Sequence, residues 1–285
     1  MPRWRSGRAR RRPTRPPADA VRLFTIGDSL AAGVLEVGSP QRQRPFPDLL
    51  ADLVRARGTA VTTANAARPS ATLADARRRQ AAELRAFRPT VAIVWVGLND
   101  VLRWTFDAGA VRDALEEVLD VVRAAGARPL TATMPRPGEV LGIPGWSGRR
   151  IGARVEALNE QVLAAGAARG AVVLDLGALA RGRRATAFGP DGVHLSPYGH
   201  ALVAHGYLDL LERAGLVPGL VPLPEARLVP ADAALVPGRA WTPADRAAWA
   251  ATSGAVYAAR RAIAASAGRL GAGTAPDGEP ASRAT

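Results

Sequence analysis

The chain has no cysteine, no lysine and only three histidines among its 285 residues. Without cysteine it can form neither a disulfide framework nor a thiolate metal site, which fits a reducing compartment. Long hydrophobic runs are also missing: the first apolar stretch, residues 21–26, is far shorter than the roughly 20 residues that cross a bilayer. Because no apolar segment of signal-peptide length follows the basic start of the chain, we expect a cytoplasmic protein without a membrane partner.

All 38 basic residues are arginine, and the formal net charge is +13. Seven of these arginines lie in the first 17 residues, and the others are spread beside Asp and Glu over segments with helical patterning. The absence of lysine, together with abundant Ala, Gly and Pro, indicates GC-rich coding. Since no nucleic-acid recognition motif accompanies the charge, we expect solvated helix faces and no nucleic-acid partner.

Segments typical of strands and helices alternate from residue 20 to residue 216. The expected strands are residues 21–26, 60–64, 91–96, 129–133 and 171–174. The expected helices are residues 46–57, 72–87, 107–125, 149–169 and 197–214, with Asp107 and Ser196 as N-caps of the third and the last. This alternation predicts a five-stranded parallel sheet covered by helices on both faces. Ligands of such sheets bind beyond the carboxyl ends of the strands.

The remaining segments lack this alternation. We expect residues 1–19 to be a disordered arginine-rich arm, residues 217–265 a C-terminal extension with one helix, and residues 266–285 a disordered tail. Residues 20–216 would then form one α/β domain. Two long loops inside it, residues 135–148 and 177–193, are of a length that is usually functional.

The first expected strand leads into Gly27-Asp28-Ser29-Leu30, where a sharp turn can hold a hydroxyl at the carboxyl edge of the sheet. Far downstream, Asp191 and His194 lie three residues apart. A serine hydroxyl is a weak nucleophile until a base takes its proton, and an imidazole base needs a third group to fix its tautomer. We therefore predict a catalytic triad of Ser29, His194 and Asp191.

Four segments together resemble the SGNH hydrolases, also called the GDSL lipase/esterase family, over roughly residues 20–214. They are Gly27-Asp28-Ser29-Leu30, Asn65 to Thr72, Gly97-Leu98-Asn99-Asp100 and Asp191-Gly192-Val193-His194. The resemblance implies a three-layer α/β/α, flavodoxin-like sandwich. It also implies that Ser29 is the nucleophile, that Asp191 orients His194, and that the Asn99 amide donates to the oxyanion.

The second of these segments departs from the family pattern at Ser70, where a glycine normally supplies a backbone N–H to the oxyanion hole. Serine keeps the N–H, but a backbone φ above zero is much easier for glycine to adopt. We expect the oxyanion hole to consist of the backbone N–H groups of Ser29 and Ser70 and the side chain of Asn99. Its second donor would be altered rather than lost.

Four further residues adjoin these segments and are candidates for the substrate pocket: Arg68, Trp104, Phe106 and Trp146. For the three aromatic residues, a role as core or loop anchors is an equal alternative. His200 and His205 fall on the last expected helix, where partial burial or solvent contact is expected. No set of His, Asp and Glu has the spacing of metal ligands, so we expect no metal and no cofactor.

The leading hypothesis is a serine esterase that cleaves small-molecule carboxylic esters through an acyl-enzyme intermediate. With the same triad, the enzyme could transfer the acyl group to another alcohol or amine, or remove acetyl groups from sugars. A third hypothesis is a non-catalytic binding protein on a hydrolase scaffold, with the arginine-rich arm contacting nucleic acid. The intact Ser29, Asp191 and His194 argue against it, and the substitution at Ser70 argues weakly for it.

Overall fold

The computed structural model describes residues 20–34, 43–134, 145–189 and 191–217, and the single residues 242, 244, 247 and 251. One sheet contains the strands β1 (Val21–Gly27), β2 (Val61–Asn65), β3 (Val91–Trp95), β4 (Arg128–Ala132) and β5 (Val172–Leu174). Their order is β2-β1-β3-β4-β5, and every neighbouring pair is parallel. The predicted five-stranded parallel sheet is confirmed, with its strand boundaries shifted by a residue or so.

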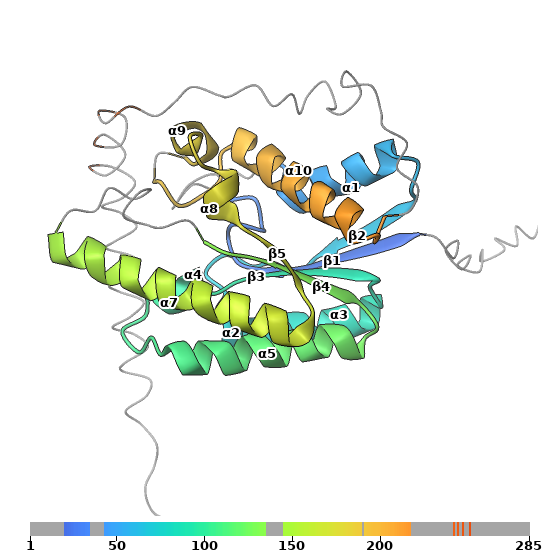
Figure 1. Ribbon diagram of the computed structural model, residues 1–285, viewed down its shortest axis with the longest axis horizontal. Helices are drawn as coiled ribbons and strands as arrows, with labels where there is room; N and C mark the ends of the chain where they lie inside the picture. Colours follow the sequence, from blue (N-terminus) through green and yellow to red (C-terminus); the bar gives the residue numbers. More distant parts are fainter. Residues whose placement is uncertain are drawn as a thin grey trace, which may run out of the picture.

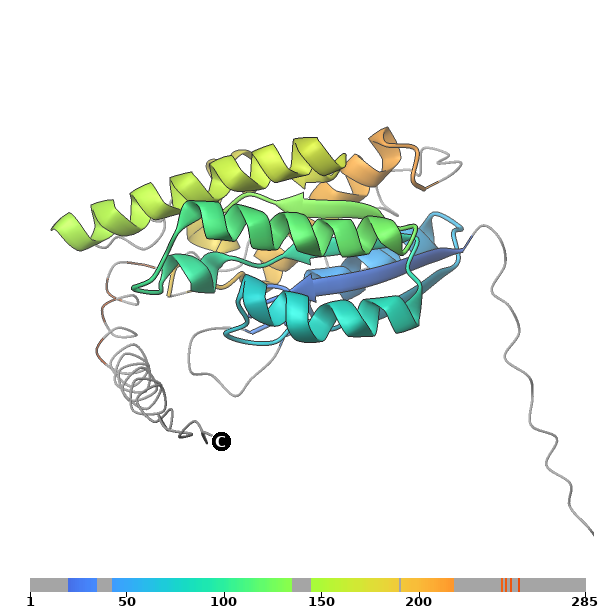
Figure 2. The same cartoon turned by 90° about the horizontal axis from the view of Figure 1, so that it is seen from below.

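Helices cover both faces of this sheet (Figures 1 and 2). They are α1 (Phe46–Ala56), α2 (Leu73–Asp75), the π-helical turn η1 (Ala76–Gln80), α3 (Ala81–Phe87), α4 (Leu98–Val101), α5 (Ala108–Ala124), α7 (Gly145–Arg169), α8 (Leu176–Leu179), α9 (Arg184–Ala187) and α10 (Pro197–Arg213). In Figure 1, α1 and α10 pack side by side above the sheet, and α3, α5 and α7 lie below it. The three-layer α/β/α sandwich is therefore confirmed.

The core is built around β3, whose residues are all buried. This strand is apolar on both of its faces because helices cover both faces of the sheet. On the α1 side, the ring of Phe46 meets Trp95 edge to face at 5.3 Å and lies 5.6 Å from the ring of Tyr207 on α10. These contacts hold α1 and α10 against the carboxyl half of β3.

The two predicted N-caps are confirmed. The Asp107 carboxylate accepts a hydrogen bond from the backbone N–H of Ala110, at 2.7 Å, and starts α5. The Ser196 hydroxyl accepts one from the N–H of Gly199, at 3.0 Å, and starts α10. Each cap satisfies one of the backbone donors that the first turn of a helix leaves without a partner.

Three segments differ from their predicted structure. The helix expected to begin at residue 149 begins at Gly145, inside the loop expected over residues 135–148; the rest of that loop lies outside the described residues. The helix expected over residues 72–87 is divided into α2, η1 and α3 by its π-helical turn. The loop expected over residues 177–193 contains two short helices, α8 and α9. The first of these begins where the Asp175 carboxylate accepts a hydrogen bond from the N–H of Ala178, an N-cap that the sequence analysis missed.

The expected arm (residues 1–19) and tail (residues 266–285) lie outside the described residues, and so does nearly all of the expected C-terminal extension. The boundaries of these segments therefore stay predictions. Within the described ranges, none of the helices combines the length and the apolar character that crossing a bilayer requires.

Candidate active site

The candidate site lies at the carboxyl edge of the sheet, where the strand order reverses. The chain continues from β1 outward to β2, and then returns to β3 on the other side of β1. In open α/β sheets this reversal opens a crevice between the loops that leave the two central strands. Ser29 follows β1 and Asn99 follows β3, so both residues lie at this crevice.

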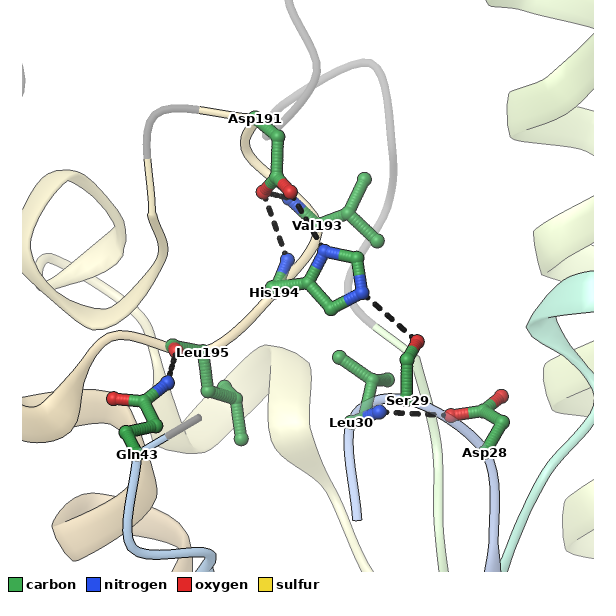
Figure 3. A network of polar contacts seen from close by, with 8 residues as sticks. All are labelled: Asp28, Ser29, Leu30, Gln43, Asp191, Val193, His194 and Leu195. Atoms are coloured by element: carbon green, nitrogen blue, oxygen red, sulfur yellow. Dashed lines mark hydrogen bonds and ion pairs between the residues drawn. The ribbon is translucent and has the colours of Figure 1, made fainter. Parts of the chain in front are cut away.

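Ser29, His194 and Asp191 form one continuous chain of hydrogen bonds (Figure 3). The Nε2 atom of His194 is 2.8 Å from the Ser29 Oγ, although the two residues are 165 positions apart in the sequence. The Nδ1 atom of the same ring is 2.6 Å from the Asp191 Oδ2. The structure therefore brings the three residues predicted as a triad together in the predicted order.

The Asp191 carboxylate is held in its ionised form. Burial works against the charge, but the hydrogen bond from His194 and two backbone N–H groups outweigh it and lower the pKa of Asp191. Those N–H groups belong to Val193 and His194, and both donate to the Asp191 Oδ1 at 2.9 Å. Because a carboxylate only accepts hydrogen bonds, the proton of the neutral ring lies on Nδ1, and Nε2 is left to accept from the Ser29 hydroxyl.

The turn that carries Ser29 is packed tightly. A Cβ atom on Gly27 would lie 2.6 Å from the Cβ of Ala31 and 3.0 Å from the backbone oxygen of Trp95, so only glycine fits there. Asp28 is fully buried, and its Oδ1 accepts a hydrogen bond from the N–H of Leu30 at 3.0 Å. Burial raises the pKa of the Asp28 carboxyl to about 7. Asp28 thus supports the turn and points away from His194 (Figure 3).

The loop after β2 is tied to this turn by Asn65. The Asn65 side chain donates to the backbone oxygen of Ala31 at 2.8 Å and accepts from the N–H of Ala67 at 3.0 Å. Farther along the same loop, Ser70 has a φ of 64° and is exposed. Ser70 therefore adopts the left-handed backbone conformation that favours glycine. For a residue with a Cβ, this conformation costs about 1–2 kcal/mol.

Asn99 is the second residue of α4. This helix begins directly after Gly97, whose φ is 133°. The Asn99 Nδ2 donates to the backbone oxygen of Ala71 at 3.0 Å, and the neighbouring Asp100 accepts from the N–H of Leu73 at 3.1 Å. These two bonds join the loop after β3 to the loop that carries Ser70. Because a side-chain amide has two N–H groups, one of those of Asn99 remains for another acceptor.

The described candidates for the substrate pocket differ in their surroundings. Arg68 is exposed and pairs with Glu83 at 3.2 Å, and Trp104 is 84% exposed. The guanidinium of Arg150 lies 5.2 Å from the centre of the Trp104 ring, within the range of a cation–π contact. Phe106 is half-buried, and the side chain of Trp146 lies outside the described residues. A role of these residues in the pocket stays a prediction.

The other two histidines are kept neutral by their surroundings. His200 is completely buried rather than partly buried as expected, and burial lowers its pKa to about 3. Its Nδ1 accepts a hydrogen bond from the N–H of Phe46 at 3.2 Å, so its role is to join α10 to α1. Burial, aided by Arg57, also lowers the pKa of the half-buried His205. Among the described residues no three potential metal ligands come together.

Two glutamines that the sequence analysis did not single out also reach the site. Gln43 donates to the backbone oxygen of Leu195, the residue after His194. Gln80 pairs with both backbone groups of Gly27, just before Ser29. Neither contact has a sequence signal, because each joins residues that are far apart in the chain.

Comparison with known proteins gives one family match and a set of similar structures. The model of the GDSL-like lipase/acylhydrolase family matches residues 25–202. A lipase/acylhydrolase from Enterococcus faecalis is 23% identical with a TM-score of 0.54, over 72% of this chain and 99% of that one. A psychrotrophic esterase from Pseudoalteromonas sp. is 20% identical with a TM-score of 0.55, over 68% and 98%. An acetylxylan esterase from Geobacillus stearothermophilus is 17% identical with a TM-score of 0.55, over 67% and 94%. At these identities the likeness shows a shared fold, and no curated protein matches the chain.

Proposed function

The chain belongs to the GDSL-like lipase/acylhydrolase family and is a hydrolase, and we propose that it cleaves carboxylic esters through an acyl-enzyme formed on Ser29. One observation carries this proposal: the unbroken hydrogen-bonded chain from the Ser29 Oγ through His194 to Asp191. It gives a nucleophile, a base and a group that orients the base, in contact before any substrate arrives. We assign this chemistry to the domain of residues 20–216.

In the first half of the reaction, the Ser29 Oγ attacks the carbonyl carbon of the ester while the His194 Nε2 takes the hydroxyl proton. The carbon becomes tetrahedral and its oxygen negative. When the bond to the leaving alkoxide breaks, His194 returns the proton to that oxygen, and an alcohol departs. The acyl group is then esterified to Ser29.

In the second half, water takes the place of the alcohol. The His194 Nε2 removes a proton from the water as its oxygen attacks the acyl carbon, and then gives that proton back to the Ser29 Oγ. A carboxylic acid leaves and the enzyme is restored. Asp191 stays ionised throughout, because the positive charge that forms on the His194 ring in each half adds to the interactions that lower its pKa.

We expect three donors to meet the oxyanion, and they lie on loops that hydrogen bonds join to one another. They are the backbone N–H groups of Ser29 and Ser70 and the second amide N–H of Asn99. The hydrogen bond from Asn99 to Ala71 keeps the last two donors together. A donor of this kind lowers the barrier by about 3 kcal/mol, because it is already aimed where the charge develops.

A second candidate activity is the removal of acetyl groups from sugars. Its support is the side chain of Trp104, which is 84% exposed on the loop that follows α4 and Asn99. The guanidinium of Arg150 lies over one face of the ring, and the other face can stack on the apolar face of a pyranose ring. One solved structure of this fold is also an acetylxylan esterase.

The test combines a substrate series with labelling of the nucleophile. Purified protein is assayed on p-nitrophenyl esters from acetate to palmitate and on acetylated xylo-oligosaccharides, with Ser29→Ala as the matched control. We expect ester turnover by the wild type only, and covalent labelling of Ser29 by a fluorophosphonate. Equal turnover by Ser29→Ala, or labelling of a different serine, would overturn the proposal. A preference for the acetylated sugars that Trp104→Ala abolishes would favour the second activity.

A further inference from the structure

The side chain of Gln80 is bound face to face with the backbone of Gly27. The Gln80 Oε1 accepts a hydrogen bond from the Gly27 N–H at 2.8 Å, and the Gln80 Nε2 donates to the Gly27 carbonyl oxygen at 3.0 Å. Gln80 is 1% exposed, although it directly follows three arginines in the sequence. Gly27 is the last residue of β1, two positions before Ser29.

This pair of hydrogen bonds forms beyond the end of β2, where β2 no longer offers β1 a backbone partner. Along the shared edge, the carbonyl oxygen of Thr25 accepts from the backbone N–H of Ala66, and that of Gly27 accepts from Arg68 at 3.1 Å. However, β2 ends at Asn65, and the N–H of Gly27 bonds to the Gln80 side chain instead of to a strand. Because a buried N–H needs a partner, the Gln80 amide stands in for the missing residue of β2.

Gln80 is placed there by an unusual turn of helix. It is the last residue of η1, in which the N–H of Ala81 bonds to the carbonyl oxygen of Ala76, five residues earlier. The helix that leads into η1 is itself anchored, because Thr72 forms a capping box with Asp75. A π-helical turn is rare and occurs often at functional sites. The anchored start and the wide turn together direct a helical side chain to the end of β1.

We propose that Gln80 is a positioning residue of the reaction, which holds the carboxyl end of β1 so that the Ser29 Oγ stays within reach of His194. This inference rests on the proposed function. There is little free space at Gly27, because a Cβ there would lie 2.6 Å from the Cβ of Ala31 and 3.0 Å from the backbone oxygen of Trp95. The Gly27 oxygen also accepts a hydrogen bond from the N–H of Arg68. Gln80 is therefore linked through this oxygen to the loop that carries Ser70.

The role requires an amide or its chemical equivalent. The two backbone groups of Gly27 present one donor and one acceptor side by side, and a primary amide offers the complementary pair. Leucine has neither group. An ionised glutamate has only acceptors and would face the Gly27 oxygen with a negative charge, whereas a protonated carboxyl group again offers one donor and one acceptor.

The test therefore compares Gln80→Leu with Gln80→Glu. The same changes at Gln161, a half-buried glutamine of α7, are the matched controls. Active sites are counted by fluorophosphonate titration, and kcat per active site and KM are measured from about pH 5.5 to about pH 9, below and above the pKa expected of a buried carboxyl group. Thermal unfolding is followed in parallel. A residue that only stabilised the fold would lower the melting temperature and the number of sites, and would leave kcat per site unchanged.

We expect Gln80→Leu to lower kcat per site by about tenfold to about a hundredfold at every pH, with little change in KM, because small misplacements of reacting groups cost this much. Gln80→Glu should be closest to the wild type at low pH and fall toward the Leu variant as the introduced carboxyl group ionises. The ratio of variant to wild type isolates residue 80, because every other ionisable group is the same in the two proteins. The Gln161 variants should follow the wild type.

Two results would overturn the inference. One is a kcat per site within twofold of the wild type in Gln80→Leu. The other is a Gln80→Glu variant as impaired as Gln80→Leu at every pH. Either result, combined with complete loss of activity in Ser29→Ala, would remove the role of Gln80 and leave the proposed esterase intact. Retention of activity in Ser29→Ala would instead remove the proposed function.

Discussion

Ser70 offers a direct test of the proposed oxyanion hole, because the effect of its backbone conformation can be separated from that of its side chain. Its φ of 64° lies in the left-handed region, and the residue is exposed. Replacing it with glycine removes the crowding of the Cβ, worth about 1–2 kcal/mol, and adds about 0.5–1 kcal/mol of chain entropy to be lost on folding. The net effect is a stabilisation of about 0–1.5 kcal/mol. For a domain of this size, that is an increase of a few degrees at most in the melting temperature.

The same reasoning predicts the kinetics. Ser70→Gly should keep or raise kcat, because the backbone N–H stays and its conformation becomes easier to adopt. Ser70→Ala should match the wild type, since the hydroxyl has no assigned role. Ser70→Val should lower kcat by up to about a hundredfold, because a β-branched residue avoids positive φ and would turn the N–H away from the oxyanion.

Arg88 provides the control. It is the other non-glycine residue with a positive φ among those described, at 54°, and it ends α3 at the opposite edge of the sheet from Ser29. Arg88→Gly should stabilise the protein as Ser70→Gly does and leave kcat unchanged. Thermal unfolding and initial rates on a p-nitrophenyl ester measure both effects. A large loss of kcat in Ser70→Ala would refute the reasoning, since it would show that the hydroxyl itself contacts the substrate.

Four further predictions follow from the site. Ser29→Ala should lower ester hydrolysis by several orders of magnitude, measured as kcat/KM, and residual turnover above about a tenth would contradict the assigned nucleophile. His194→Ala should be as damaging and Asp191→Asn somewhat less so; the opposite ranking would place the base elsewhere. Asn99→Ala should lower kcat about a hundredfold with little change in KM, and an unchanged kcat would limit Asn99 to joining the two loops. Finally, the pKa of Asp28 is about 7 in the folded protein and 3.8 as the ordinary value. The contribution of Asp28 to stability is therefore present at low pH and is lost as the pH rises to about 7. Because the side chain of Asp28→Asn stays neutral, urea unfolding should show the stability of this variant rising relative to that of the wild type between about pH 4 and about pH 7. Parallel plots of stability against pH for the two proteins would show that Asp28 is ionised throughout this range.

Much of this protein can be predicted from the sequence, because its signals are local. The strands β3 and β5 are short apolar runs, and β3 is apolar on both faces because it is central and parallel. Asp107 and Ser196 cap their helices through contacts with residues three positions away. The family resemblance also uses short motifs, and the match to residues 25–202 confirms it.

Only the tertiary structure decided the contacts between distant parts of the chain. The 2.8 Å approach of His194 to Ser29 spans 165 positions, and the fold alone could bring the two together. The complete burial of His200 depends on α1, which precedes it by about 150 residues in the chain. Gln80 follows three arginines and looks like part of a solvated helix face, yet the end of β2 and the π-helical turn place it against Gly27, 53 positions away. Local patterning determines which elements form and which motifs they carry, whereas the partner of a buried polar group depends on where the neighbouring strands end, and that is a property of the assembled sheet.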